Sequence, residues 1–242
     1  LPIFGGAQEI MVGSTATLVG IVSDFGVYDL PFVFANEKEA DTVLDGPFGQ
    51  KMHARLADKN LIGLAYFELG FRNITNSRKP IVNVEDIAGL KLRVIPNAIN
   101  VDWVKALGAN PTPMAFPEVY AALEQKAIDA QENPLNVILA NKFYEVQKHL
   151  ALTNHQYNPQ SLIISKKVWD GLDATHQSVL SEAARESAIF QRTEARRLEG
   201  AALESLRKRG MVVTRLPDGE ARKMAERLRP VTDKYLKTLP AD

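Results

Sequence analysis

Hydrophobic positions along the chain switch repeatedly between two spacings. In some segments apolar and polar residues alternate, as in a half-buried strand, and in others apolar residues recur every three or four positions, as on one side of a helix. Strands or extended segments are predicted at 9–15, 61–67, 90–94, 111–116, 127–132, 149–154, 160–165 and 211–216. Helices are predicted at 38–59, 100–108, 117–126, 133–146, 173–210 and 218–239, with breaks at Gly46-Pro47 and Pro230. This alternation favours an α/β fold with a mostly parallel sheet.

The segment from Asp173 to Gly210 is unusually long for one predicted element. It contains no proline and one internal glycine, Gly200, and its apolar residues recur at helical steps. Asp173 is a suitable N-cap. One helix of about 35 residues would be roughly 50 Å long, which exceeds the diameter of a small domain. We therefore expect a helix that contacts two domains, and the alternative is two helices bent at Gly200.

Composition narrows the class of protein without identifying it. The chain has 242 residues, of which 45% are hydrophobic and 24% charged, as in ordinary globular proteins. Lysine plus arginine equal aspartate plus glutamate, at 29 each, which argues against a general nucleic-acid or anionic-membrane surface. No apolar run approaches the length of a membrane span. Cysteine is absent, so neither a disulfide nor a cysteine metal site is expected.

Motifs for catalysis are missing from the sequence. None of the four histidines, His53, His149, His155 and His176, pairs with another at the spacing of a helical zinc site. No GxSxG elbow, P-loop or GxGxxG is present. The residues therefore offer little support for an enzyme and imply no cofactor or metal.

One predicted strand carries an arginine that needs a partner. In "GLKLRVIPN", residues 89–97, Leu90, Leu92 and Val94 alternate onto one face, which leaves Arg93 on the other. Both faces of a central strand are usually covered, and an unpaired buried charge costs several kcal/mol. The partner is either an acid of this chain or a carboxylate that comes from outside.

Further polar residues stand at the ends of predicted strands, where open α/β sheets bind ligands. They are Arg72, Asn133 and His155, and with Arg93 they would make an anion-friendly cleft, since the arginine fork suits a carboxylate. Each has a simpler interpretation: Arg93 pairs with an internal acid, Arg72 is a solvated loop residue, Asn133 is a helix N-cap and His155 is structural. Phe116 is likewise explained as plain core.

Five stretches taken together are more specific than any single residue. They are "GFRNITNSRKPI", "EDIAGLKLRVIPN", "ALGANPTPMAFPEVYAALEQKAIDAQENPL", "KFYEVQKHLALTNHQY" and "LPFVF". With them the chain resembles the solute-binding subunit of tripartite ATP-independent periplasmic (TRAP) transporters, the DctP-like family of extracytoplasmic solute receptors. The resemblance runs from about Glu9 to the long helix and more loosely to the C-terminus, and 107–134 is its most specific part.

The resemblance implies an α/β fold of the two-lobed periplasmic binding protein kind (type II-like), with the long helix spanning both lobes. We expect lobe I at 1–68 and 159–197 and lobe II at 69–158 and 198–242. Family members normally begin with a strand, a helix and a second strand before the stretch that corresponds to Glu9. By this comparison an N-terminal segment of lobe I is missing from the sequence. If the molecule itself lacks the segment, lobe I has an exposed sheet edge, and if the sequence merely starts late, the fold of lobe II is unaffected.

The family pattern also implies roles for single residues. Arg93 matches the arginine that forms the salt bridge with the ligand carboxylate, and Arg72 matches one that adds a second contact. Phe116 would pack over the ligand, Asn133 would hydrogen-bond its carboxylate region, and His155 would lie near its far side or its water network. Weaker matches are Asn97 after the Arg93 strand and, in lobe I, Ser14, Thr15 and Glu68.

The function implied is capture of an organic acid anion in the periplasm and its delivery to TRAP membrane subunits, without catalysis. The receptor would be a monomer that does not span the membrane and binds no nucleic acid. The acid itself stays open: a mono-acid with a hydroxylated or small apolar tail fits, and Arg72 plus Arg93 equally suit a diacid. Alternatives are an acid-converting enzyme that uses His155 and the effector domain of a regulator. Without ligand, Arg93 is expected to be solvated in a cleft or to hold a buffer anion.

Overall fold

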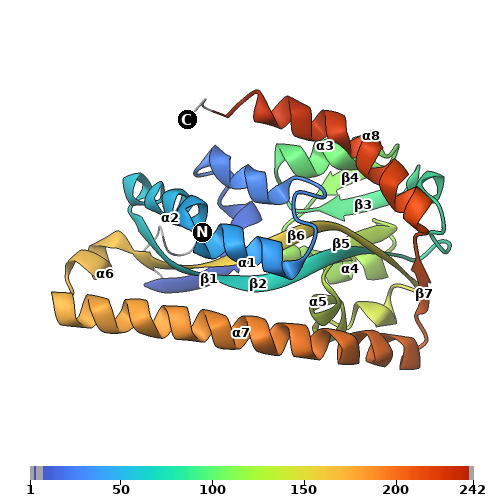
Figure 1. The fold of residues 1–242 in the computed structure, drawn as a ribbon. Helices are drawn as coiled ribbons and strands as arrows, with labels where there is room; N and C mark the ends of the chain where they lie inside the picture. Colours follow the sequence, from blue (N-terminus) through green and yellow to red (C-terminus); the bar gives the residue numbers. More distant parts are fainter. Residues whose placement is uncertain (1–2, 4–7, 240–242) are drawn as a thin grey trace. The chain divides into compact units, whose positions relative to one another are not determined.

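The computed structural model describes residue 3 and residues 8–239 (Figure 1). The chain folds into two compact units. Unit 1 comprises 1–28, 34–70 and 158–196, and unit 2 comprises 29–33, 71–157 and 197–242. The two-lobed α/β fold expected from the sequence is confirmed, whereas the lobe boundaries drawn from the sequence stay a prediction.

Unit 1 is built from short helices on long strands. Its elements, in chain order, are β1 (Ile10–Ser14), α1 (Glu37–Asp45), α2 (Pro47–Ala54), the first part of β2 (Leu61–Asn76), the last part of β6 (His149–Ser165), α6 (Lys166–Asp170) and most of α7 (Ala174–Lys208). Helices α1 and α2 meet at Gly46, whose extended backbone and the Pro47 that follows separate them. The predicted break at Gly46-Pro47 is therefore confirmed.

Unit 2 alternates short strands with helices. Its elements are the rest of β2, β3 (Lys91–Val94), α3 (Ala98–Ala106), β4 (Asn110–Pro113), α4 (Val119–Glu124), β5 (Ala130–Asn133), α5 (Leu135–Ala140), the first part of β6, the end of α7, β7 (Val212–Arg215) and α8 (Asp218–Leu236). A core cluster of this unit includes Leu123, Ile138, Phe143, Leu150 and Leu206, which are all buried. The apolar end of α7 thus belongs to the core of unit 2.

The sheet is mixed, where the sequence favoured a mostly parallel one. Its strand order is β1-β6-β2-β5-β3-β4, and β7 also pairs with β6. Strand β3 runs parallel to β4 and β5, and β6 runs parallel to β7, but β1 with β6 and β2 with β5 are antiparallel. Helical crossovers join β3, β4 and β5 and make them parallel. The long strands β2 and β6 are not bound by that constraint.

Four predicted elements differ from the structure. The two strands predicted at 149–154 and 160–165 form the single strand β6. The predicted helix at 133–146 ends at Ala140, because Lys142 takes a left-handed backbone conformation with φ 55°. Asn133 ends β5 and Pro134 is the N-cap, so the helix-cap interpretation of Asn133 is wrong. Helix α8 continues through Pro230, where the predicted break is absent and the residue lies exposed to water.

The long helix is one continuous element, as expected (Figure 1). The backbone amide of His176 donates to the Asp173 carboxylate at 2.9 Å, which confirms Asp173 as the N-cap. A side chain at Gly200 would meet no atom within 4 Å, so no close contact requires a glycine there. The helix contributes residues to both units.

Within unit 1, two arginines of α7 bind acids of α1 and β2. Arg192 donates to the Tyr66 carbonyl and to both carboxylates Asp41 and Asp45, at 2.6–3.1 Å. Arg196 binds Asp41 at 2.8 Å and also pairs with Glu68. The Arg192 side chain is only 6% exposed, so the network fixes α7 against unit 1 in a low-dielectric setting.

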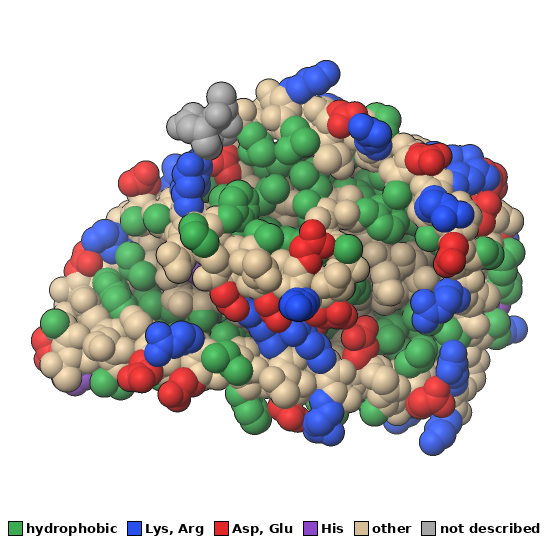
Figure 2. Space-filling model, viewed as in Figure 1, with side chains coloured by type: hydrophobic (Ala, Val, Ile, Leu, Met, Phe, Trp, Pro, Cys, Tyr) green, Lys and Arg blue, Asp and Glu red, His purple; other side chains and the backbone are tan. Residues whose placement is uncertain are grey.

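The surface carries both signs of charge. On the face drawn in Figure 2, lysine and arginine side chains lie interspersed with aspartate and glutamate side chains. Among the described residues, no helix is both long and apolar enough to cross a membrane. Within the same residues, no group of three or more acidic or histidine side chains is placed to hold a metal ion.

Replacing Arg192 by alanine should destabilise the protein. The change leaves the buried Tyr66 carbonyl without its hydrogen-bond donor. It also removes the counter-charge of Asp45, but Asp45 is exposed to water, so this part of the lost stability is smaller. We expect the free energy of unfolding to fall by about 2 kcal/mol in urea titrations followed by circular dichroism. Arg185→Ala, on the exposed face of the same helix, should change it by less than about 0.5 kcal/mol. Equal effects of the two variants would show that the network has no stabilising role.

Candidate functional site

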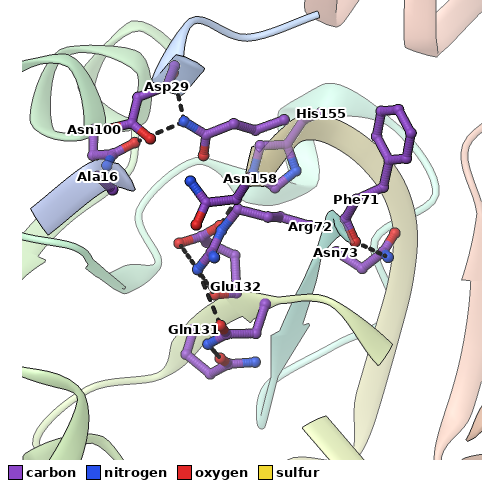
Figure 3. Close-up of polar contacts among 12 residues, drawn as sticks. Ala16, Asp29, Phe71, Arg72, Asn73, Asn100, Gln131, Glu132, His155 and Asn158 are labelled. Carbon is purple, nitrogen blue, oxygen red and sulfur yellow. Dashed lines mark hydrogen bonds and ion pairs between the residues drawn. The ribbon is translucent and has the colours of Figure 1, made fainter. Parts of the chain in front are cut away.

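A buried ion pair of unit 2 joins Arg72 of β2 to Glu132 of β5. Their side chains are 0% and 1% exposed. The strands pair antiparallel with Ile74 opposite Glu132, which brings the two charges onto one face. Arg72 donates to the Glu132 carboxylate from Nε and Nη2, and Nη2 also reaches the Glu132 carbonyl at 2.6 Å and Asn133 Oδ1 at 3.2 Å (Figure 3). The interpretation of Arg72 as a solvated loop residue is thus wrong, whereas its role as a ligand contact stays a prediction.

The pair keeps Glu132 ionised. Burial alone opposes the charged form, but the Arg72 charge and hydrogen bonding outweigh it and hold the pKa of Glu132 at about 2. His155 lies beside the pair, with Nε2 3.5 Å from Glu132 Oε2 and Nδ1 2.8 Å from the Thr153 hydroxyl. If Thr153 donates to Nδ1, the Nε2–H faces the carboxylate. His155 therefore supports the acid of the pair.

One donor of Arg72 remains unused. Its Nη1 is buried and has no hydrogen-bond partner among the described residues. A buried donor without a partner costs about 1–3 kcal/mol. The guanidinium thus has its charge compensated by Glu132, while its Nη1 donates to no described residue.

Arg93 of β3 has a different environment. It is 2% exposed, and Nε and Nη2 both donate to the Met114 carbonyl, at 3.0 and 2.8 Å. Its guanidinium carbon lies 5.8 Å from the centre of the Phe116 ring. Within the described residues no carboxylate forms an ion pair with it. The expectation of a solvated Arg93 is wrong, because a backbone carbonyl accepts its N–H groups, and the alternative of an internal acid partner is not realised either.

The charge of Arg93 is therefore uncompensated by a direct partner. Burial lowers its pKa to about 10, with the Glu132 charge raising it and the Arg72 charge lowering it. At neutral pH the guanidinium is still protonated. A carbonyl satisfies hydrogen bonds but carries no net charge, so the cation remains attractive to an anion.

A second polar cluster surrounds Asp29, which sequence reasoning missed. Asn97 caps α3 by accepting from the Asn100 amide at 2.9 Å, and its Nδ2 donates to Asp29 Oδ2 at 2.7 Å. Gln156 donates to the Asp29 carbonyl and to Asn100 Oδ1 (Figure 3). Burial raises the pKa of Asp29 to about 7, although the Arg72 charge and the Asn97 hydrogen bond lower it. No local motif marks Asp29, whereas Glu132 is an acid within a buried strand and could have been found on that basis.

The predicted site residues fall into both units. Unit 2 contains Arg72, Arg93, Asn97, Phe116, Asn133 and His155. Phe116 is 40% exposed, and Asn133 donates to Gln131 Oε1 at 2.6 Å.

Unit 1 contains the other three predicted contacts. Ser14 donates to Asn158, Thr15 donates to the Pro159 carbonyl at 3.2 Å, and Glu68 pairs with Arg196. All nine residues stay predictions as ligand contacts.

The geometry of unit 2 defines a class before any comparison: an α/β protein whose buried arginines are suited to holding an organic anion. The family model described as "Bacterial extracellular solute-binding protein, family 7" matches residues 3–238. The chain belongs to this family, which confirms the resemblance found in the sequence.

Relatives with named ligands support this placement. The 2,3-diketo-L-gulonate-binding periplasmic protein of Escherichia coli is 36% identical over 98% of this chain and 72% of its own length. The C4-dicarboxylate-binding periplasmic protein of Rhodobacter capsulatus is 33% identical over 98% of this chain and 72% of its own. A sugar acid binding protein from Advenella mimigardefordensis, solved in complex with galactonate, is 45% identical with a TM-score of 0.94, over 96% of this chain and 75% of that one. The chain spans 62–72% of the length of the curated relatives it matches first.

The raised pKa of Asp29 predicts a pH dependence of stability. A carboxyl with a usual pKa near 4 and a folded-state pKa of about 7 binds protons more tightly in the folded state. Its contribution to stability is complete below pH about 4 and is lost as pH rises to about 7. Asp29→Asn should flatten that part of the profile of unfolding free energy against pH, and Asp233→Asn, an exposed matched change, should not. The Glu132 pair acts oppositely, but its contribution changes between its usual pKa of 4.5 and about 2, which overlaps this window only at the acid end. A profile unchanged by Asp29→Asn would contradict the assignment.

Proposed function

We propose that this chain is the ligand-binding portion of an extracytoplasmic receptor that captures an organic acid anion and delivers it to TRAP membrane subunits. The observation that carries the proposal is Arg93: a buried guanidinium whose fork is oriented by a carbonyl but whose charge has no direct counter-ion among the described residues. A carboxylate is the group that such a fork binds best. Relatives that are named for 2,3-diketo-L-gulonate, for C4-dicarboxylates and for sugar acids support an organic acid as the class of ligand.

The other residues of unit 2 take supporting roles in this proposal. Arg72 offers its unused Nη1 to a ligand oxygen, and Asn133 stands at the end of β5 beside it. The Phe116 ring lies near the Arg93 guanidinium and packs against the ligand. Asn97 and His155 act on the site through Asp29 and Glu132, which they contact. Ser14, Thr15 and Glu68 are proposed as contacts from unit 1.

The family supports a proposal for the location and the partners of this receptor. The family consists of extracellular solute-binding proteins, so we place this receptor in the periplasm, as a monomer that binds its ligand and the membrane subunits of the transporter. The mixed surface charge favours a small anion over nucleic acid.

Catalysis is the alternative, and the setting of His155 disfavours it. An enzyme would need this imidazole to reach the ligand as a base, but the side chain is 0% exposed and lies between Thr153 and Glu132. Incubation with galactonate should therefore raise the melting temperature without changing the proton NMR spectrum of the acid. New resonances that depend on the protein would favour the enzyme.

Arg93 is the residue on which to test the proposal. Arg93→Lys keeps the charge but loses the two-pronged geometry, so the affinity for a bound acid measured by calorimetry should fall by about 2 kcal/mol, ~30-fold. Arg93→Met should abolish measurable binding. Arg222→Lys, at an exposed position of α8, should leave the affinity unchanged. Full affinity in Arg93→Met would remove the basis of the proposed function.

A further inference from the structure

The buried cluster of unit 2 contains two arginines but does not carry two net positive charges. Two guanidinium groups would suit two ligand carboxylates, as in a C4-dicarboxylate. Arg72, however, already holds a carboxylate: its Nε and Nη2 bind Glu132, and both side chains are almost completely buried. One of the two positive charges is thus compensated within the chain.

The remaining positive charge belongs to Arg93. Apart from burial, the charges that act on its pKa are those of Glu132 and Arg72. These two nearly cancel as an ion pair, so the cluster presents about one net positive charge to an incoming ligand. Asp29, which also lies in the field of Arg72 and Glu132, adds negative charge whenever it is ionised. It never adds a second cation.

From this charge count we infer that the site selects organic acids with a single carboxylate and excludes dicarboxylates. The inference rests on the proposed function and specifies its ligand class.

The exclusion follows from what a second carboxylate would meet. To bind it, Arg72 would have to leave Glu132, and Glu132 would then be a buried carboxylate without its main counter-charge. Breaking a buried pair in this way costs several kcal/mol. If Arg72 stays, the second ligand carboxylate is itself buried close to Glu132 without a cation, which is unfavourable for the same reason. A hydroxyl group, in contrast, needs only a hydrogen bond, and Arg72 Nη1 is a free donor for one.

The test compares acids that differ in charge and little else. Calorimetry at pH 6, where Asp29 with its pKa of about 7 is mostly protonated and adds no negative charge, would use galactonate, galactarate and the monoamide of galactarate. Erythronate and tartrate would serve as a four-carbon pair. We expect galactonate or erythronate to bind, the corresponding diacid to bind ~100-fold more weakly or not at all, and the monoamide to bind far better than galactarate. The monoamide is the matched control, because it has the size of the diacid and the charge of the mono-acid.

Each outcome decides a different claim. Diacids that bind as tightly as mono-acids would overturn the charge count while leaving the receptor function intact. A monoamide excluded together with galactarate would show that size decides, which also overturns it. Failure of every acid to bind would overturn the proposed function, and this inference with it.

Variants test the residue responsible. Glu132→Gln removes the compensating charge, so the ratio of diacid to mono-acid affinity should rise at least ~10-fold, a ratio that does not depend on the fraction of folded protein. Glu226→Gln, an exposed change of the same kind in α8, should leave it unchanged. If Glu132→Gln does not fold, Arg72→Met combined with Glu132→Met removes both charges of the pair. The cluster then still carries about one net positive charge, that of Arg93. Diacids should then still be excluded, and their tight binding would contradict the inference.

Discussion

The buried pair between Arg72 and Glu132 is the interaction on which the polar interior of unit 2 depends. Taking two charges out of water is unfavourable, and mutual attraction offsets this only when the geometry is good and the remaining donors and acceptors are satisfied. Here the fork contacts both carboxylate oxygens, and Nη2 adds the Glu132 carbonyl and Asn133. The pair exists because β2 and β5 are antiparallel in this register, and a slip of one residue would turn the two side chains to opposite faces.

The pair also sets the conditions for its neighbours. It gives His155 a carboxylate to face, and its two charges act on the pKa values of both Asp29 and Arg93. In a low-dielectric interior such effects are stronger than in water. Four titratable groups drawn from β2, β3, β5 and the segment at Asp29 therefore behave as one electrostatic unit, and a change in any of them alters the others.

How much of this was predictable depends on whether the signal was local. The long helix α7 was predictable, because the absence of proline and the Asp173 cap lie within the segment itself. The partner of Arg72 was not, because Glu132 stands 60 positions away and meets it only through strand pairing. Asn133 was ambiguous for a physical reason: an asparagine before proline suits both the end of a strand and the start of a helix. No residue pattern around Asp29 indicates that its side chain is buried.

Arg93 shows how a buried side chain can have hydrogen-bond acceptors and still attract a ligand. A guanidinium has two requirements, acceptors for its N–H groups and a counter-charge, and the Met114 carbonyl meets only the first. Had the chain supplied a carboxylate instead, the cation would have been neutralised and a ligand would have had to displace it. A carbonyl holds the fork in place, so little side-chain entropy remains to be lost on binding, and the positive charge is left for an anion. Arg72 and Arg93 thus have different roles. Strand β5 lies between their two strands, and its Glu132 pairs with Arg72, whereas Arg93 binds only a backbone carbonyl.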